Sequence, residues 1–451
     1  MKRDIEQELL SWKQQKQCMP ILLRGARQVG KSFTIEQFGK AYFDNLVVAN
    51  FELRPELKQC FNTRQPHEIL LKLSLMLHQE ITPGRTLLFL DEIQDCPDAI
   101  IALRYFKELL PDLHVIGAGS LLEFTLNSPD FRTPVGRVQS LYLKPLSFKE
   151  FLSALGYHDL RKLIEATDVS NPITEPVHQE LLKWIRYYMA LGGMPGVLQD
   201  FLSSERISFG NMSRSYDIQK CQAQQTILLN GYRQDFGKYA KHHQVEYVQK
   251  VFEKAPGLVG GHVKYSKIDP DTRAQNVKSA LSLLEYAGLI CPIYSTAASG
   301  IPLATLMNEK KFKILFLDIG LMTRTTQVAT QLLLDDDIIL VNRGAIAEQL
   351  VGQELLAYAP YIEEPRLYFW CREKKSSMAE VDFITTVDST IVPIEVKAGS
   401  TGKLKSLQLL MDEKKLEVGV RVSQNSLSLE GRILSVPFYM IGEISRLVKA
   451  L

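Results

Sequence analysis

The chain has 451 residues, of which 45% are hydrophobic and 23% charged, and its 53 Lys and Arg balance 51 Asp and Glu. This length is greater than one domain with a single hydrophobic core usually has, and it fits about two or three domains. The net charge of +2 argues against a protein coated by nucleic acid, although it is compatible with a local basic patch. An apolar run of about 18 residues, which a membrane-spanning helix needs, is absent from the sequence. The charged N-terminus and six scattered cysteines without a CxxC pair predict a cytoplasmic protein with reduced thiols and no membrane partner.

The first third of the chain alternates short apolar runs with helical stretches, as βαβ units do. The strand candidates are residues 20–24, 46–51, 86–90, 114–118 and 138–143. Helices are expected between them, for example at 32–43 and 99–110. Continuous apolar strands of this kind are typical of a parallel sheet that is covered on both faces, so this part predicts an α/β domain.

A glycine-rich loop follows the first of these strands and precedes a helix. It matches the pattern GxxxxGK(S/T) in full and reads Gly25-Ala26-Arg27-Gln28-Val29-Gly30-Lys31-Ser32. In this motif, backbone N–H groups and the positive end of the next helix hold phosphate oxygens. We therefore expect an ATP site in which Lys31 reaches the β- and γ-phosphates and the Ser32 hydroxyl ligates Mg²⁺.

Two carboxylates, Asp91 and Glu92, follow the strand candidate at 86–90. Ligands bind at the carboxyl ends of the strands in open parallel sheets, so these side chains are expected near the loop. Asp91 would hold the magnesium ion, and Glu92 would polarise the attacking water. Ser120, after the fourth strand, either contacts the γ-phosphate or the water or caps the next helix. Arg137 is either an arginine finger or a surface arginine.

The middle of the chain, residues 146–330, is expected to be mostly helical. Residues 201–330 contain 16 Lys and Arg against 10 Asp and Glu. This excess predicts either a surface for an acidic partner such as DNA or RNA or a solvated helical face.

A winged helix is expected within about 240–330. Asp269 and Pro270 predict the start of a helix that ends at Gly288, because Asp is a frequent N-cap and Pro a frequent first helical residue. The apolar runs 289–293 and 313–317 would form the strands of a wing. Such a helix either enters the DNA major groove, with Arg273 and Lys278 among its contacts, or serves packing and protein contact.

The C-terminal part contains a D-x(n)-E-x-K pattern across two adjacent strand candidates, formed by Asp382, Glu395 and Lys397. Residues two apart on a strand share a face, so Glu395 and Lys397 converge. Asp382 and Glu395 could share a second divalent metal, Mg²⁺ or Mn²⁺, with Glu348 as a further contact and Lys397 on the water or phosphate. The pattern also occurs by chance, and a chain that carries it can use the fold as an inactive scaffold.

Taken together, these motifs resemble a prokaryotic family of AAA-type ATPases with a C-terminal DUF4143 domain. The resemblance covers essentially the whole chain and rests on residues 25–32, 90–94, 117–120, 192–195, 316–321 and 395–397. Threonine is usual in the family where Ser32 stands, and either hydroxyl can ligate magnesium. The resemblance implies an AAA-type ATPase domain at 1–145, a helical region with a winged helix at 146–330, and a restriction-endonuclease-like domain of the PD-(D/E)XK type at 331–451.

Two functions of different classes fit this sequence. In the first, an ATPase cycle controls metal-dependent cleavage of nucleic acid by the C-terminal domain. In the second, the chain is an ATP-dependent switch that binds a protein partner or further copies of itself and carries an inactive nuclease fold. The intact set of Asp382, Glu395 and Lys397 favours the first function, and the small net charge favours the second.

Overall fold

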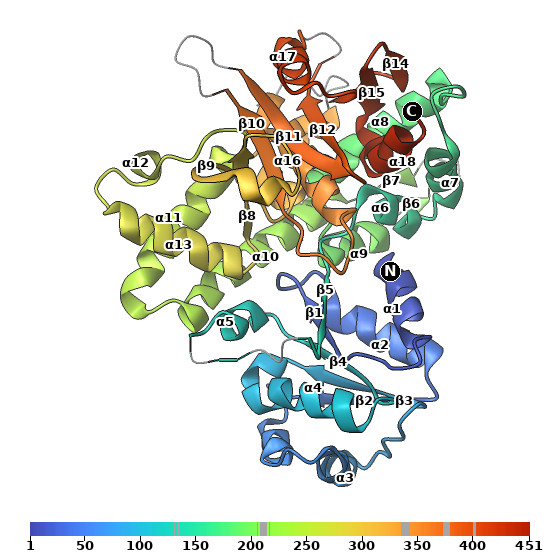
Figure 1. The fold of residues 1–451 in the computed structure, drawn as a ribbon, viewed down its shortest axis with the longest axis vertical. Helices are drawn as coiled ribbons and strands as arrows, with labels where there is room; N and C mark the ends of the chain where they lie inside the picture. Colours follow the sequence, from blue (N-terminus) through green and yellow to red (C-terminus); the bar gives the residue numbers. More distant parts are fainter. Residues whose placement is uncertain are drawn as a thin grey trace. The chain divides into compact units, whose positions relative to one another are not determined.

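The computed structural model describes residues 1–129, 131–132, 136–204, 206–207, 214–215, 217–334, 343–372, 379–399 and 403–451 (Figure 1). It has the α/β fold class that the sequence predicts, and its contacts divide into two compact units. Unit 1 comprises Met1–Lys144 with the short segments Tyr286–Gly288 and Ala359–Pro365. Unit 2 comprises Pro145–Glu285, Leu289–Tyr358 and Arg366–Leu451. The predicted domain boundaries at residues 145 and 330 stay predictions.

Unit 1 contains a five-stranded parallel sheet in the order β2-β3-β4-β1-β5. The strands are β1 (Ile21–Arg24), β2 (Asn45–Asn50), β3 (Thr86–Asp91), β4 (His114–Ala118) and β5 (Gln139–Tyr142). The α-helices are α1 (Ile5–Lys13), α2 (Lys31–Tyr42), α3 (Pro66–Leu77), α4 (Pro97–Leu109) and α5 (Leu122–Leu126). The predicted parallel sheet is therefore confirmed. Its edge strand β5 makes one further backbone hydrogen bond, in which the Tyr142 N–H donates to the Tyr361 carbonyl at 2.9 Å.

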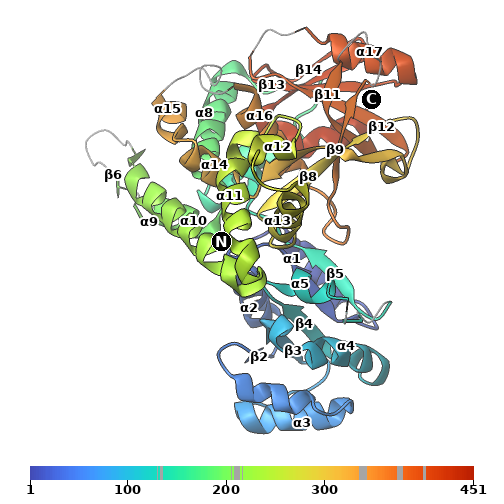
Figure 2. The same cartoon turned by 90° about the vertical axis from the view of Figure 1, so that its left-hand side faces the viewer.

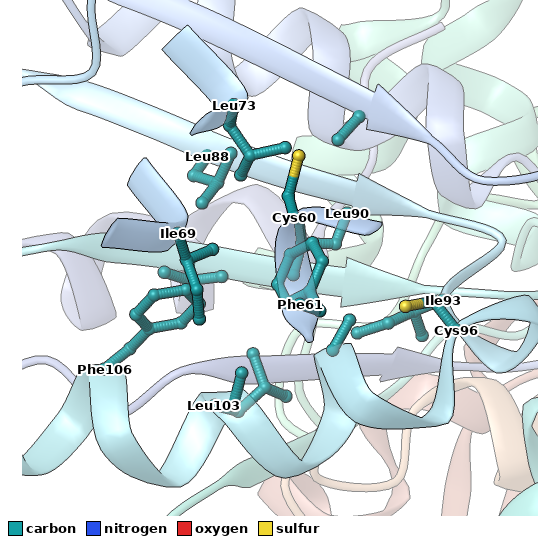
Figure 3. Close-up of a cluster of buried hydrophobic side chains, with 14 of the residues drawn as sticks. Cys60, Phe61, Ile69, Leu73, Leu88, Leu90, Ile93, Cys96, Leu103 and Phe106 are labelled. Atoms are coloured by element: carbon teal, nitrogen blue, oxygen red, sulfur yellow. The ribbon is translucent and has the colours of Figure 1, made fainter. Parts of the chain in front are cut away.

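The hydrophobic core of unit 1 explains why its central strands read as continuous apolar runs. Strands β3 and β4 are buried along their whole length. Leu88 and Leu90 of β3 lie in one cluster with Ile69 of α3 and with Leu103 and Phe106 of α4 (Figure 3). Burial of such side chains stabilises the sheet by about 1.5–3 kcal/mol each.

Unit 2 is built on an eight-stranded mixed sheet in the order β14-β15-β13-β12-β11-β10-β8-β9. Its strands are β8 (Ile290–Thr296), β9 (Met307–Phe316), β10 (Leu367–Cys371), β11 (Glu380–Val387), β12 (Thr390–Val396), β13 (Gly419–Ser423), β14 (Ser428–Glu430) and β15 (Ile433–Pro437). A separate two-stranded ribbon consists of β6 (Arg206–Ile207) and β7 (Arg214–Ser215).

The middle of the chain is mostly helical, as the sequence predicts. Most of the described helices belong to unit 2, and the longest of them is α10 (Figure 2). They are α6 (Phe148–Ala154), α7 (His158–Ala166), α8 (Glu175–Leu191), α9 (Pro195–Ser203), α10 (Ile218–Tyr239), α11 (His242–Leu258), α12 (Tyr265–Ile268), α13 (Ala274–Tyr286, which ends in unit 1), α14 (Ile319–Thr325), α15 (Ala329–Leu334), α16 (Arg343–Ala357), α17 (Lys405–Lys414) and α18 (Ile444–Lys449). None of the helices in the described part of the chain has the length and apolarity of a membrane span.

The predicted winged helix differs from the structure in two respects. Helix α13 begins at Ala274 and not at Pro270, because Asp269 accepts hydrogen bonds from the Asp271 N–H (3.1 Å) and the Thr272 hydroxyl (2.8 Å) in a turn before the helix. The two wing strands do pair, as β8 and β9, but β8 also pairs with β10 of the large sheet. This hairpin is therefore continuous with the C-terminal strands, and a DNA-binding winged helix stays a prediction.

A buried polar network joins two motifs that lie far apart in the sequence. The Asp318 carboxylate, which is fully buried, accepts hydrogen bonds from the N–H groups of Gly193 (2.7 Å) and Leu321 (3.1 Å) and from Gln353 Nε2 (3.3 Å). Gly192 has φ 79°, and a Cβ atom there would lie 2.0 Å from Asp318 Oδ1. Gly192 is thus explained by its close approach to Asp318, just before α14, while a Cβ atom at Gly193 would lie 2.2 Å from the Leu146 carbonyl oxygen.

Candidate nucleotide-binding site

The glycine-rich loop joins the carboxyl end of β1 to the first residue of α2. Gly25 and Gly30 have φ values of 145° and 96°, and Gln28 between them has 65°. A Cβ atom at Gly25 would lie 2.2 Å from the Leu143 carbonyl oxygen, so this position requires glycine. The loop therefore has the compact, left-handed backbone that can turn N–H groups toward an anion.

Arg3 braces this loop from the N-terminal segment. Its guanidinium donates to the Val29 carbonyl at 2.9 Å and to the Lys144 carbonyl at 2.7 Å, and the residue is buried. This contact was not predicted from the sequence, because one arginine near the N-terminus matches no motif. Arg3 is a positioning residue that connects the loop backbone to the segment after β5.

Lys31 is buried at the start of α2, and its ammonium donates to the carbonyls of Gly25 and Ala26, both at 2.8 Å. Burial lowers the pKa of Lys31 to about 8, although the nearby carboxylates of Glu92 and Asp91 oppose this change. The amine is thus held inside the loop, where its charged form loses the solvation that water would give it.

Ser32 and Asp91, the two predicted magnesium ligands of the loop region, contact each other directly. The Ser32 hydroxyl donates to Asp91 Oδ1 at 2.9 Å, and Asn50 Nδ2 donates to Asp91 Oδ2 at 2.8 Å. Burial and the neighbouring Glu92 charge raise the pKa of Asp91, while the hydrogen bonds from Ser32 and Asn50 oppose the shift. Asn50, at the end of β2, is a contact that the sequence analysis missed.

Glu92 is fixed by three hydrogen bonds to its Oε2 atom. The donors are the Ser120 N–H (3.0 Å), the Ser120 hydroxyl (3.1 Å) and Gln94 Nε2 (2.8 Å). Burial acts to raise the pKa of Glu92, but these hydrogen bonds and the Lys31 charge outweigh it and lower the pKa. The carboxylate is therefore ionised at neutral pH. The backbone of Glu92 has φ 47°, in the left-handed region.

Ser120 does not cap the next helix, because α5 begins after Leu121 without a side-chain cap. Its hydroxyl donates to Glu92 instead, and its contact with the γ-phosphate or the water stays a prediction. Gly119 beside it leaves room for Gln94, since a Cβ atom there would lie 1.7 Å from Gln94 Oε1. Ser120 and Gln94 therefore share the task of orienting Glu92.

Arg137 pairs with a residue outside this group. Its guanidinium lies 3.0 Å from Glu108 Oε1 of α4, and nearly half of the side chain is exposed. The structure thus brings Lys31, Ser32, Asp91 and Glu92 together around the loop. Arg137 instead forms an ion pair at the surface. Its role as an arginine finger stays a prediction.

The C-terminal residues of the D-x(n)-E-x-K pattern lie close together, with Asp382 and Glu395 on the paired strands β11 and β12 and Lys397 directly after β12. Asp382 is on β11, and its Oδ2 accepts from the Val396 N–H at 2.8 Å. Glu395 ends beside Lys397, with 2.6 Å between Oε1 and Nζ. The predicted second metal centre is not supported, because in the described part of the chain no three His, Cys, Asp or Glu side chains are grouped to hold a metal ion.

The sequence analysis missed a lysine in this region. Lys313 Nζ of β9 lies 3.2 Å from Glu348 Oε2, 2.5 Å from Glu380 Oε1 and 3.8 Å from Asp382 Oδ1. Burial opposes its charge, but the three carboxylates outweigh burial and raise the pKa of Lys313. Glu380 also contacts His262 at 2.6 Å.

Three family models match consecutive parts of the chain. They are an AAA domain at residues 17–152, the domain of unknown function DUF8612 at 182–332, and the domain of unknown function DUF4143 at 343–439. Among curated proteins, no match was found.

Several solved structures show a distant likeness. The Walker-type ATPase PABY2304 of Pyrococcus abyssi has 16% identity and a TM-score of 0.43, over 72% of this chain and 95% of that chain. The RuvB Holliday junction branch migration motor of Thermotoga maritima has 15% identity and a TM-score of 0.28, over 64% and 89%. DnaA from Aquifex aeolicus, bound to AMPPCP, has 11% identity and a TM-score of 0.27, over 62% and 86%. At these scores the likenesses carry no further argument.

A parallel sheet with the glycine-rich loop after β1 and two carboxylates at the end of β3 defines a P-loop NTPase fold. The chain combines this AAA-type ATPase domain with a C-terminal DUF4143 domain, as the sequence predicted. The restriction-endonuclease-like character of the DUF4143 domain stays a prediction.

Proposed function

We propose that this protein binds ATP with Mg²⁺ at the glycine-rich loop and hydrolyses it. The observation that carries the proposal is the contact between Ser32 and Asp91, 2.9 Å apart, beside a buried Lys31 and an oriented Glu92. A hydroxyl and a carboxylate are the oxygen ligands that Mg²⁺ prefers, and both come from positions where P-loop proteins hold this ion. The residues therefore fit the nucleotide and the ion that the fold implies.

Each residue has a defined task in this proposal. Lys31 exchanges the Gly25 and Ala26 carbonyls for phosphate oxygens and neutralises their charge. Ser32 and Asp91 hold Mg²⁺, which supplies further charge neutralisation on the phosphates. Glu92 is ionised, so it can accept a proton from the attacking water, and Ser120 and Gln94 keep its carboxylate in place.

The experiment that tests this proposal is steady-state ATP hydrolysis by the purified full chain. We expect Mg²⁺-dependent phosphate release that is lost in Lys31→Ala, where ATP affinity falls at least about tenfold, or about 1.4 kcal/mol. Equal affinity of both proteins for a fluorescent ATP analogue would contradict the proposal.

We expect this protein to act in the cytoplasm. Its nucleotide cycle could control one of two activities. One is nucleic acid cleavage by the C-terminal domain, and the other is nucleotide-dependent binding of a protein partner or of a second copy. Contact with DNA is supported by the exposure of Arg273, Gln275 and Lys278 at the start of α13. Incubation of the protein with DNA or RNA, Mg²⁺ or Mn²⁺, and ATP separates cleavage from binding.

A further inference from the structure

Lys313 is a buried charged residue that contacts three partly buried carboxylates. It lies on β9 among apolar neighbours, and its side chain is only 2% exposed. Its ammonium contacts Glu348 of α16 at 3.2 Å, Glu380 of β11 at 2.5 Å and Asp382 of β11 at 3.8 Å. A buried ammonium is stable only when it is paired, so these three carboxylates are what allow a lysine at this place.

The same carboxylates are the ones that a metal-dependent nuclease site would need. Asp382 directs Oδ1 toward Lys313 and uses Oδ2 to accept the Val396 N–H. Glu348 uses Oε2 for Lys313. Glu395 uses Oε1 for Lys397. Each of the three predicted metal ligands therefore already has a partner from this chain.

The Lys313 ammonium occupies the point where the carboxylates of Glu348, Glu380 and Asp382 converge, which is the position that Mg²⁺ would need. Glu395 Oε2 is buried without a hydrogen-bond partner, so it is the clearest unused acceptor of the cluster. Mg²⁺ requires near-octahedral coordination by oxygen and binds firmly only where several protein oxygens converge. A divalent cation next to Asp382 would also lie close to the Lys313 ammonium, and like charges in a buried site repel strongly. The residues present therefore do not fit a divalent metal.

We infer that Lys313 is the resident cation of this cluster, in the place where a nuclease of this kind would hold a divalent metal. The C-terminal domain then does not cut nucleic acid by metal-dependent hydrolysis. Instead, the Lys313 cluster ties α16 to β9 and β11 and serves the fold. This inference does not depend on the proposed ATPase, and it assigns the output of the protein to binding and not to cleavage.

The test is Mn²⁺ binding by the full chain without nucleotide, followed by electron paramagnetic resonance of free Mn²⁺. An Asp91→Asn background removes the predicted ligand near the P-loop, so that any bound ion belongs elsewhere. In this background we expect no Mn²⁺ binding up to about 1 mM. Lys313→Ala frees Glu348, Glu380 and Asp382 together, and we expect it to bind Mn²⁺ at least tenfold more tightly. The matched control is Lys310→Ala, an exposed lysine of the same strand, which should bind none.

The result that would overturn the inference needs no lysine variant and so survives if Lys313→Ala fails to fold. It is Mn²⁺ binding by the protein with Lys313 intact, lost on Glu395→Gln. Cleavage of DNA or RNA by the wild type with Mn²⁺, with or without ATP, and lost in the same variant, would overturn it equally. Absence of both in the wild type supports it.

Discussion

Lys31 is expected to make ATP binding depend on pH. Burial lowers the pKa of its ammonium to about 8, so the free protein loses this charge as the pH rises above about 8. Phosphate oxygens beside the amine favour its charged form, so the complex retains the proton to higher pH. Binding then takes up a proton above pH 8, and affinity decreases as the pH rises.

The size of this effect follows from the two pKa values. The ordinary pKa of a lysine is 10.5, so the loop disfavours the charged form by about 3 kcal/mol, at about 1.4 kcal/mol per pH unit. If the phosphates remove this penalty, affinity falls about tenfold for each pH unit between about 8 and 10.5. Folding without nucleotide shows the opposite trend. Between these pH values the unfolded chain binds more protons than the folded chain, so the free energy of unfolding rises with pH.

Titration of a fluorescent ATP analogue between about pH 7.5 and 9.5, at constant Mg²⁺ and ionic strength, measures the dependence. Lys31→Met should bind weakly with little change over this range, because methionine carries no proton. Lys40→Met, which removes an exposed lysine from the same helix, should keep the wild-type slope. A flat wild-type curve, or an equal decline in Lys31→Met, would refute the argument.

Three further outcomes are expected. Glu92→Gln should retain ATP but hydrolyse it about 10²–10⁴ times more slowly; unchanged turnover would assign the role to another residue. Asp318→Ala removes the acceptor of the Gly193 and Leu321 N–H groups and one of two acceptors of Gln353 Nε2, so the free energy of unfolding measured in denaturant should fall by about 3 kcal/mol. The exposed Asp271→Ala is its control, and an equal loss there would remove the explanation. Reversal of Arg273 and Lys278 to Glu should weaken any DNA binding and lower its salt slope by up to about two; a wild type that binds no DNA at low salt would assign α13 to packing or protein contact.

The sequence predicted what depends on local patterns. The strands of unit 1 are continuous apolar runs, and the loop from Gly25 to Ser32 is one uninterrupted motif between a strand and a helix. Both are visible in a single sequence because neighbouring residues carry the whole signal.

The contacts that the sequence did not reveal are made by residues far apart along the chain. From the sequence, Lys313 was predicted only as the first residue of a wing strand. Its carboxylate partners on α16 and β11 come much later in the chain, so the ion pairs were not foreseen. The hydrogen bonds of Ser120 to Glu92 depend on β4 lying beside β3, which neither segment shows alone. Arg3 reaches Val29 and Lys144 only after the sheet has formed.

The arrangement of the two units along the chain has a consequence for synthesis and truncation. Unit 1 is complete only with Tyr286–Gly288 and Ala359–Pro365, so unit 2 consists of long insertions into it and a C-terminal extension. During translation, the edge strand β5 is made long before Tyr361, whose carbonyl accepts the Tyr142 N–H. Until Tyr361 has been synthesised, this edge of β5 lacks its hydrogen-bond partner, and unpaired strand edges promote aggregation. A fragment that stops near residue 145 would keep every residue of the glycine-rich loop yet lack this partner, so its solubility would not reflect that of the AAA domain in the full chain.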